Sequence, residues 1–307
     1  MAPSSSSMPK PDAVPAAHDA MLHAAWAARR RVFRGLHERG CFVVPNPWDV
    51  GSARYLQHLG FPALATTSAG FAFSQGLPDS GDVVVVGRNA NLAYIASIAA
   101  AVDLPVSADF MSGYGLEPED VAESVARCVA TGVAGLSIED STGDPASPLR
   151  ELPVAVERVR AARQAIDRSG ADVLLTARAE CYHVGHPDPL RESVRRLQAY
   201  AAAGADVLFA PGPQNPADIK TLVEAVAPKP LNLLVVRDIG IGVEEIAALG
   251  VRRISVGGAL ALAAWTGFIR AAQALKSGGS FAGLAGLVPY ADINALFETR
   301  AAGQQAG

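Results

Sequence analysis

Residues 105–140 read PVSADFMSGYGLEPEDVAESVARCVATGVAGLSIED and contain two short apolar runs on either side of a stretch with helical spacing. The runs predict strands at 105–109 and 134–139, and the stretch between them predicts a helix at 118–131. The glycine of ATGVAG lies where that helix must end and the chain must turn into the next strand. Apolar runs of this kind are typical of parallel strands that helices cover on both faces. The segment therefore predicts one strand–helix–strand unit of a parallel sheet.

The same alternation continues in both directions from this unit. Further strands are predicted at 41–46, 62–67, 172–177, 206–210, 231–236 and 253–257. Further helices are predicted at 50–60, 89–102, 153–168, 188–203, 215–226 and 243–249. Eight strands, nearly all followed by a helix, close most simply into a (β/α)8 TIM barrel. A doubly wound open sheet is the alternative, but it requires a glycine-rich phosphate loop after the first strand, and NPWDVGS at 46–52 lacks the GxGxxG spacing.

Composition limits the possible partners and the compartment. The 307 residues include 50% hydrophobic side chains, enough for one large core. A net charge of −4 argues against nucleic acid as a partner, and no apolar run reaches the roughly 20 residues that span a membrane. Cys41, Cys128 and Cys181 are widely spaced and form no CxxC pair, so we expect neither a zinc knuckle nor a disulfide framework. We expect a cytoplasmic protein.

The N-terminal part divides into a tail and a helix. Residues 1–17 are rich in Ser, Pro and Ala and lack the apolar core of a secretory signal, which predicts a disordered tail. Residues 18–39 carry apolar positions at helical spacing and stop at Gly40. We expect one barrel domain, including this leading helix, over residues 18–285.

Two acids stand where neighbouring predicted strands end. Asp109 follows the apolar run of one strand, and Glu139 that of the next. Buried carboxylates repel each other unless a cation or a proton lies between them, and hard oxygen ligands with room for water suit a magnesium-like ion. Asp79, in LPDSGD, either caps the next turn or lends an oxygen to the outer shell of that metal.

Other residues after the predicted strands suit a small anionic ligand. Arg178 and Glu180 are two apart and point to the same side, where the arginine either grips a substrate carboxylate in a bidentate manner or neutralises the acids. The small residues Ser68, Ala69 and Gly70 either let successive backbone N–H groups approach a carboxylate or form a plain tight turn.

Three further positions complete the candidate site. Asn232, on the seventh predicted strand, places an amide within reach of the pocket. Trp48 is either a pocket wall or a plug of the barrel, and its neighbour Asp49 is predicted to cap the following helix. His183 and His186 have a spacing that invites zinc, but without a clustered third ligand we expect solvated loop histidines.

With these positions in place, the chain from about residue 41 to about residue 275 resembles the isocitrate lyase and phosphoenolpyruvate mutase superfamily. The resemblance rests on a set of motifs in this order: NPWDVGSARYLQHLGFPALATTSAGFAFSQGLPD, SADFMSGYG, SIED, LLTARAE and HPDPLRESVRRLQAYAAAGADVLFAPG. It implies a TIM barrel that uses Mg²⁺ or Mn²⁺ to act on small 2-oxo or 2-hydroxy carboxylates, making or breaking a C–C or P–C bond.

The resemblance also implies roles for individual residues. Asp109 matches the direct metal ligand, and Asp79 and Glu139 match acids that hold the metal's waters. Ser68, Ala69 and Gly70 match the loop that binds the substrate carboxylate, Arg178 matches the substrate-binding arginine, and Trp48 matches a pocket-wall aromatic. Superfamily members commonly form tetramers that exchange a C-terminal helix, which implies a homo-oligomer in which residues 286–307 form a helical segment packed on a neighbouring subunit.

Two departures from the superfamily pattern indicate a divergent branch. Met111 stands where a second acid usually follows the first in the metal-binding strand. The loop STGDPASPLRE at 141–151 lacks the lysine–cysteine–glycine–histidine motif of the isocitrate-type lyases, whose cysteine is the catalytic acid. It equally lacks the lysine and asparagine of the phosphoenolpyruvate mutase lid. Arg150 is the single cation that this loop offers.

Our leading hypothesis is a magnesium-dependent lyase that cleaves a C–C bond in a 2-oxo or 2-hydroxy carboxylate through an enolate. The candidate catalytic residues are Arg178, Glu139 and Tyr114, and the proton donor is Tyr114, His183 or a metal-bound water. Phosphonopyruvate hydrolase or phosphoenolpyruvate mutase chemistry is the second hypothesis. A non-catalytic barrel that binds a carboxylate is the third.

Overall fold

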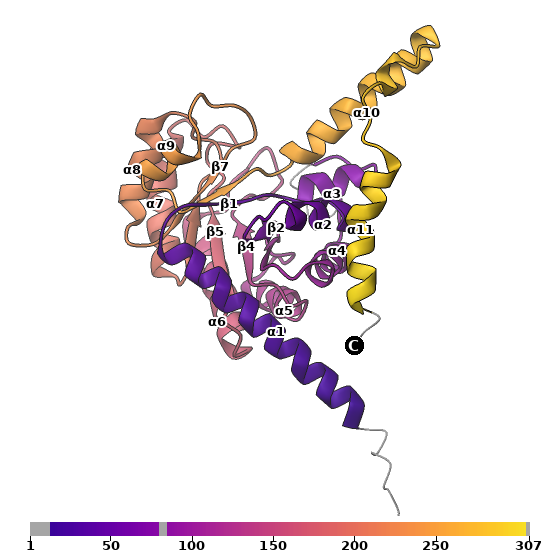
Figure 1. Cartoon of the computed structure of the whole chain (residues 1–307). Coiled ribbons are helices and arrows are strands. Elements are labelled where there is room, and N and C mark those ends of the chain that lie inside the picture. The colour runs from indigo at the N-terminus through magenta and orange to yellow at the C-terminus, as the bar shows by residue number, and fades with distance from the viewer. Residues whose placement is uncertain (1–12, 80–84, 305–307) are drawn as a thin grey trace, which may run out of the picture.

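A computed structural model of the chain describes residues 13–79 and 85–304, and the strands of that part form one parallel sheet (Figure 1). The strands are β1 Phe42–Val44, β2 Leu64–Ala65, β3 Val106–Asp109, β4 Gly135–Glu139, β5 Leu174–Arg178, β6 Val207–Phe209, β7 Leu231–Leu234 and β8 Arg253–Ser255. Their order is β1-β8-β7-β6-β5-β4-β3-β2, and each strand is parallel to its neighbours in this order. Between β1 and β2, the Ala65 N–H donates to the Pro45 carbonyl at 3.0 Å, so the barrel nearly closes. The (β/α)8 prediction is confirmed, and the open sheet is excluded.

Most of the helices lie between consecutive strands, whereas the first precedes β1 and the last two follow β8 (Figure 1). They are α1 Ala13–Glu38, α2 Val50–His58, α3 Ser68–Ser74, α4 Arg88–Ala101, α5 Pro118–Val129, α6 Leu152–Arg168, α7 Pro189–Ala202, α8 Pro216–Val226, α9 Val243–Ala248, α10 Ala259–Gly278 and α11 Tyr290–Gln304. Asp49 caps α2 as predicted, because its Oδ1 accepts from the Ser52 N–H at 2.6 Å. No helix in the described parts of the chain is long and apolar enough to cross a membrane.

The two ends of the chain differ in part from expectation. The leading helix α1 begins at Ala13, so residues 13–17, which were expected to belong to the tail, are helical. Residues 1–12 of the predicted tail lie outside the described residues. The predicted helical segment at 286–307 contains α11, although residues 305–307 are not described. The helices α3 and α10 were not predicted.

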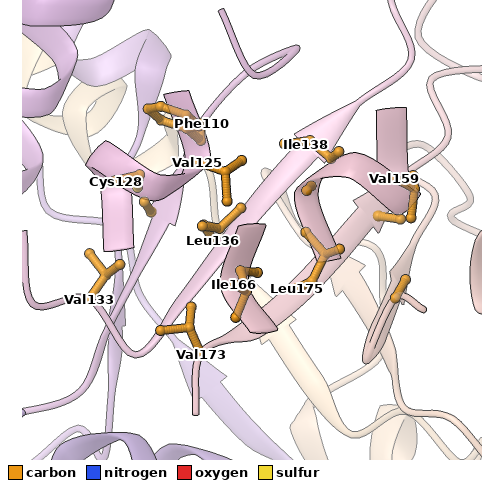
Figure 2. Close-up of a cluster of buried hydrophobic side chains, with 14 of the residues drawn as sticks. Phe110, Val125, Cys128, Val133, Leu136, Ile138, Val159, Ile166, Val173 and Leu175 are labelled. Carbon is orange, nitrogen blue, oxygen red and sulfur yellow. The ribbon is translucent and has the colours of Figure 1, made fainter. Parts of the chain in front are cut away.

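The main hydrophobic core lies between the strands and their covering helices. Figure 2 shows Leu136, Ile138 and Leu175, from β4 and β5, facing Val125 of α5 and Ile166 of α6. All five are less than 5% exposed. Full burial of such a side chain contributes about 1.5–3 kcal/mol, so this layer fixes β4 and β5 side by side. Their carboxyl ends carry the candidate site.

Large apolar side chains fill the amino-terminal end of the barrel. Phe33 of α1 packs there in a cluster with Phe42, Val44, Leu174 and Val207. A Cβ on Gly135 would lie 2.8 Å from the Phe33 ring, so only glycine fits beneath that ring.

Small polar side chains replace this packing nearer the carboxyl ends of the strands. Ser107 of β3 and Ser137 of β4 line a hollow in the barrel. Thr176 of β5 lies beside the same hollow, because its hydroxyl accepts from a cavity-lining arginine, Arg253, at 3.1 Å. The hollow opens where the sequence places its acids.

Candidate active site

A cavity of about 290 Å³ occupies the carboxyl-terminal half of the barrel, and residues from all eight strands or the loops after them line it. A second cavity, of about 500 Å³, adjoins it beneath the loop 141–148. The two cavities share Ser68, Asp79, Arg178 and His183. In a TIM barrel, this end is where loops can vary and chemistry is placed, so the shared wall is the candidate active site.

Arg178 lies at the centre of this wall. Its Nη1 is 3.3 Å from Glu139 Oε2 and 3.9 Å from Asp109 Oδ1. The position follows from the strand register, which pairs Glu139 with Arg178 at the ends of β4 and β5. On its other edge the guanidinium donates to both oxygens of Glu180, with Nη2–Oε2 at 3.2 Å. Asp109 and Arg178 line the main cavity, and Glu139 and Arg178 line the adjoining one, so Arg178 lies between the two acids.

Asp109 is held in one orientation by the loop after β2. The Ser68 N–H and the Ser68 hydroxyl donate to Asp109 Oδ2 at 2.9 and 2.8 Å. The Asp109 N–H donates to Thr66 Oγ1 at 2.8 Å. With Oδ2 held in this way, Oδ1 is the oxygen that faces the guanidinium of Arg178.

Negative charge exceeds positive charge around the cavity. Burial raises the pKa of Glu139 to about 7, and the neighbouring Glu180 and Asp109 add to the effect while Arg178 opposes it. Desolvation and then Asp109 raise the pKa of Asp79. Burial opposes ionisation of Glu180, but Arg178 and His183 outweigh it and lower the pKa of that carboxyl. Raised pKa values on two carboxyls are the response expected of a site that lacks a compensating cation.

The donor set fits a hydrated hard cation. Asp109, Glu139 and Asp79 offer carboxylate oxygens, which Mg²⁺ and Mn²⁺ prefer. Within residues 13–79 and 85–304, no three His, Cys, Asp or Glu side chains are close enough together to ligate one ion directly. Asp109, Glu139 and Asp79 are the residues that would hold such an ion, and most of its other ligands would be water.

Residues 68–70 differ from the expected loop. They begin α3, whose N-cap Thr67 accepts from the Gly70 N–H at 3.2 Å. Since Asp109 takes the Ser68 N–H, two of the three amides expected to bind a ligand already have partners within the protein. A Cβ on Gly70 would lie 2.8 Å from Trp48 Cβ, so this glycine lets α3 pack against Trp48. Ser68 and Ala69 still line the main cavity.

Other predicted residues are less central. Trp48 is half-buried beside Gly70 and is not among the described residues that line either cavity. The Tyr114 hydroxyl donates to Met111 Sδ at 3.1 Å, and Met111 rather than Tyr114 lines the second cavity. Both residues have positive φ, 49° for Met111 and 56° for Tyr114, which is strained backbone for side chains of this size.

The two loop histidines have separate partners. His183 Nδ1 lies 2.9 Å from Glu180 Oε2, and this hydrogen bond raises the pKa of His183. His186 Nδ1 accepts from the Asp188 N–H at 3.1 Å. The two ring Nδ1 atoms therefore have different neighbours, a carboxylate for His183 and a backbone N–H for His186.

Sequence reasoning missed two groups next to the site. Asp140 is buried and accepts from the Glu180 N–H, from Arg196 and from Tyr200, which ties the β5 loop to α7. Arg253 is buried inside the barrel and lines the main cavity, where its Nε donates to Oδ1 of the predicted Asn232 at 2.7 Å. The sequence did hold a signal for Arg253, because it is two residues before Ser255 on a predicted strand and therefore points to the same side, into the barrel.

Comparison with known proteins gives consistent results. The family model described as phosphoenolpyruvate phosphomutase matches residues 33–276. An uncharacterized protein of Mycobacterium tuberculosis is 33% identical over 264 residues, which cover 86% of this chain and 95% of the relative. A crystal structure of a putative lyase/mutase from Burkholderia cenocepacia is 44% identical, with a TM-score of 0.84, and covers 89% of this chain and 97% of its own. A crystal structure of 2,3-dimethylmalate lyase is 30% identical, with a TM-score of 0.78 and coverages of 92% and 99%.

Proposed function

Because the chain belongs to the phosphoenolpyruvate phosphomutase family of lyases and mutases, we propose that it is a divalent-metal-dependent lyase that cleaves a C–C bond in a small 2-oxo or 2-hydroxy carboxylate. The observation that carries the proposal is the position of Arg178, whose Nη1 lies 3.3 Å from Glu139 and 3.9 Å from Asp109 where the two adjoining cavities meet. A cationic fork beside acids that suit a hydrated metal is an arrangement that binds an anionic metabolite in a fixed orientation.

Arg178 is the substrate-binding group in this proposal. The guanidinium is held on its far edge by Glu180 and lies over the Phe209 ring, 5.2 Å from its centre. These contacts fix the plane of the fork before a ligand arrives. Burial alone would lower the pKa of Arg178, but the neighbouring Glu180, Glu139 and Asp109 outweigh it and raise this pKa, so the group stays charged. A carboxylate that enters the cavity therefore meets a preoriented partner.

A divalent cation bound beside Asp109 would supply Lewis-acid stabilisation of charge on the 2-oxo oxygen. The protein's own contribution is to hold Asp109 in one orientation through Ser68 and to concentrate negative charge that favours cation binding. Cleavage also requires a proton donor, and of the residues considered from sequence His183 is the one that lines both cavities. Its hydrogen bond to Glu180 through Nδ1 orients the ring, so Nε2 is the atom we assign to proton transfer.

A second candidate function is P–C bond chemistry, which the family model's description favours. The residues of the loop 141–148 that line the second cavity are Ser141, Gly143, Asp144, Pro145 and Pro148. These five loop residues include one acid, Asp144, and no cation, whereas a phosphonate substrate requires positive charge beyond that of Arg178. We therefore place C–C cleavage first.

A turnover assay tests both candidates. The purified protein is incubated with a panel of 2-oxo and 2-hydroxy acids and with phosphonopyruvate, in Mg²⁺, in Mn²⁺ and in EDTA. We expect metal-dependent release of a 2-oxo acid from at least one carboxylic acid of the panel by the wild type and none by D109N. Phosphate release from phosphonopyruvate alone would instead support the second candidate. Binding of an acid without any turnover would support a non-catalytic barrel.

A further inference from the structure

Three apolar side chains line the main cavity where β7 and α3 border it. Leu234 ends β7, Val236 follows two residues later, and Phe73 lies on α3. The Val235 N–H donates to the Ser255 carbonyl at 2.9 Å, so the chain continues along β8 between the first two of these side chains. Leu234, Val236 and Phe73 together are called the apolar wall below.

A glycine after β8 supports part of the apolar wall. Gly257 has a φ of 52°, in the left-handed region that favours glycine. A Cβ at this position would lie 3.1 Å from Leu234 Cδ1 and 3.6 Å from Val236 Cγ1. The Gly257 N–H donates to Asn46 Oδ1 at 2.8 Å, which fixes the glycine next to β1. Leu234 and Val236 therefore pack on bare backbone while they line the cavity.

Positive charge that a ligand can reach is scarce in this site. Among the described residues that line the two cavities, the arginines are Arg178 and Arg253, and there is no lysine. Arg253 donates through Nε to Asn232 and through Nη2 to Thr176, and its Nη1 is buried away from the cavity. Arg178 is therefore the arginine that can bind a carboxylate of a ligand. A second buried carboxylate would lack an opposite charge beside it, which is costly.

The adjoining cavity is unsuited to a second anion. Its acids are Asp79, Glu139, Asp144 and Glu180. His183, which also lines it, already has its Nδ1 2.9 Å from Glu180 Oε2. Carboxylates of the protein disfavour another negative charge close to them. The charged end of a long dicarboxylate would therefore meet acids in one cavity and the apolar wall in the other.

We propose that the apolar wall binds an uncharged alkyl chain of the substrate, so that the enzyme acts on monocarboxylic 2-oxo or 2-hydroxy acids with an apolar tail. The inference rests on the proposed function, which places the carboxylate end of the acid at Arg178, and it adds the class of the remaining part. Each methylene that leaves water for the wall strengthens binding. A terminal carboxylate at the same place loses its water and gains no partner.

The test is an equilibrium binding measurement in Mg²⁺ by titration calorimetry. Pyruvate, 2-oxobutanoate and 2-oxopentanoate lengthen one chain by a methylene at a time. The fourth probe, 2-oxoglutarate, has a carboxylate in place of the terminal methyl of 2-oxopentanoate.

The variants change the wall and a matched position outside it. V236N and L234N each place an amide on the wall, and V236R places a cation there. The control V243N makes the same change on α9, at a valine that is not among the described residues lining either cavity. Val236 and Val243 are 46% and 47% exposed, so neither substitution removes a core side chain.

We expect the affinity of the wild type to rise about three- to fourfold with each added methylene. It should bind 2-oxoglutarate at least about 10-fold more weakly than 2-oxopentanoate, because the terminal carboxylate is left unpaired. V236N and L234N should flatten the chain-length series while their affinity for pyruvate stays within about twofold of the wild type. V243N should match the wild type for all four acids. V236R should bind 2-oxoglutarate more tightly than the wild type does and 2-oxopentanoate more weakly.

Three outcomes would overturn the inference and leave the proposed function standing. They are equal wild-type affinity for pyruvate and 2-oxopentanoate, wild-type binding of 2-oxoglutarate as tight as that of 2-oxopentanoate, and an unchanged chain-length series in V236N. A wild type that binds none of the four acids would contradict both proposals. A chain-length series that depends on the wall, without turnover of any acid in the panel above, would contradict the lyase proposal and support this inference.

Discussion

At the scale of single residues, the geometry of Arg178 is the least replaceable feature of the site. Its planar fork contacts Glu180 on one edge and faces Glu139 and Asp109 on the other. Lysine has the charge but neither the plane nor the second edge. Replacing Arg178 with lysine therefore keeps the positive charge and removes the planar geometry, so the effect of the geometry can be measured separately.

We expect R178K to lower kcat/KM for the preferred acid about 100-fold or more, because one preorganised donor group is worth about that much in comparable sites. Steady-state kinetics with saturating Mg²⁺ measures the effect. The control R191K changes an exposed arginine of α7 and should leave kcat/KM unchanged. Wild-type kinetics in R178K would mean that the guanidinium neutralises the acids and does not hold the substrate.

The raised pKa of Glu139 makes stability depend on pH in a defined direction. Folding raises this pKa from its ordinary value near 4.3 to about 7, so the folded protein holds the proton more tightly than the unfolded chain does. Stability of the metal-free protein should therefore fall as pH rises through this window. Bound Mg²⁺ should restore stability at the upper end.

Thermal unfolding of metal-free wild type and E139Q between pH 5 and pH 8 measures this contribution. We expect Tm of the wild type to fall more steeply with pH than Tm of E139Q, which cannot ionise at this position. Other acids titrate in both proteins, so only the difference between the curves is attributed to Glu139. Parallel curves of Tm against pH would show that ionisation of Glu139 does not change the stability of the folded protein.

At the scale of elements, α7 is joined to the β5 loop through Asp140. This carboxyl is 3% exposed and accepts from the Arg196 guanidinium at 3.0 Å and the Tyr200 hydroxyl at 2.5 Å, both on α7. Its other oxygen accepts from the Glu180 N–H at 2.9 Å. Glu180 in turn accepts hydrogen bonds from Arg178, so α7 helps to fix the position of Arg178 through Asp140 and Glu180.

We expect D140N to cost about 3 kcal/mol in the free energy of unfolding, because it breaks a buried pair and leaves the charge of Arg196 without this partner. Urea denaturation measures the loss. The control D167N breaks the pair between Arg163 and the exposed Asp167 and should cost less than about 1 kcal/mol. Equal costs for the two variants would show that the Asp140 network does not stabilise this element.

Strands and most helices could be predicted because apolar runs and glycine stops are local signals. The helix α3 could not, since SAGFAFS at 68–74 is composed like a turn and its cap, Thr67, lies in what reads as the end of a strand. The rim residues Asp109, Glu139 and Arg178 could be predicted because they follow apolar runs. The state of Arg253 could not, because its missing partner depends on which side chains of β5 and β7 face it.

At the scale of the whole molecule, α10 projects away from the barrel, and α11 returns to pack against α2 (Figure 1). Apolar side chains of α10 are exposed, including Phe268 at 62% and Ile269 at 45%. Together with Leu262 and Trp265 they recur at helical spacing, which is the pattern of a face that another helix covers. We propose that this face, defined by these four residues, joins subunits of a homo-oligomer.

Light scattering coupled to size exclusion tests the assembly. We expect the wild type to have a mass that is a multiple of 31.7 kDa and F268E to shift towards the monomer mass, because a buried charge would oppose the contact. The control V154E introduces the same charge at an exposed apolar position of α6 and should leave the mass unchanged. A monomeric wild type would contradict the proposal.

The central claim is that one cation and one anionic ligand bind together at the carboxyl ends of β3, β4 and β5. Anomalous diffraction from crystals grown with Mn²⁺ and oxalate tests it most directly. We expect a manganese peak beside Asp109 Oδ1, with oxalate between that ion and the Arg178 guanidinium. A peak at His183 and His186, or full Mn²⁺ and oxalate occupancy away from Asp109 and Arg178, would contradict it.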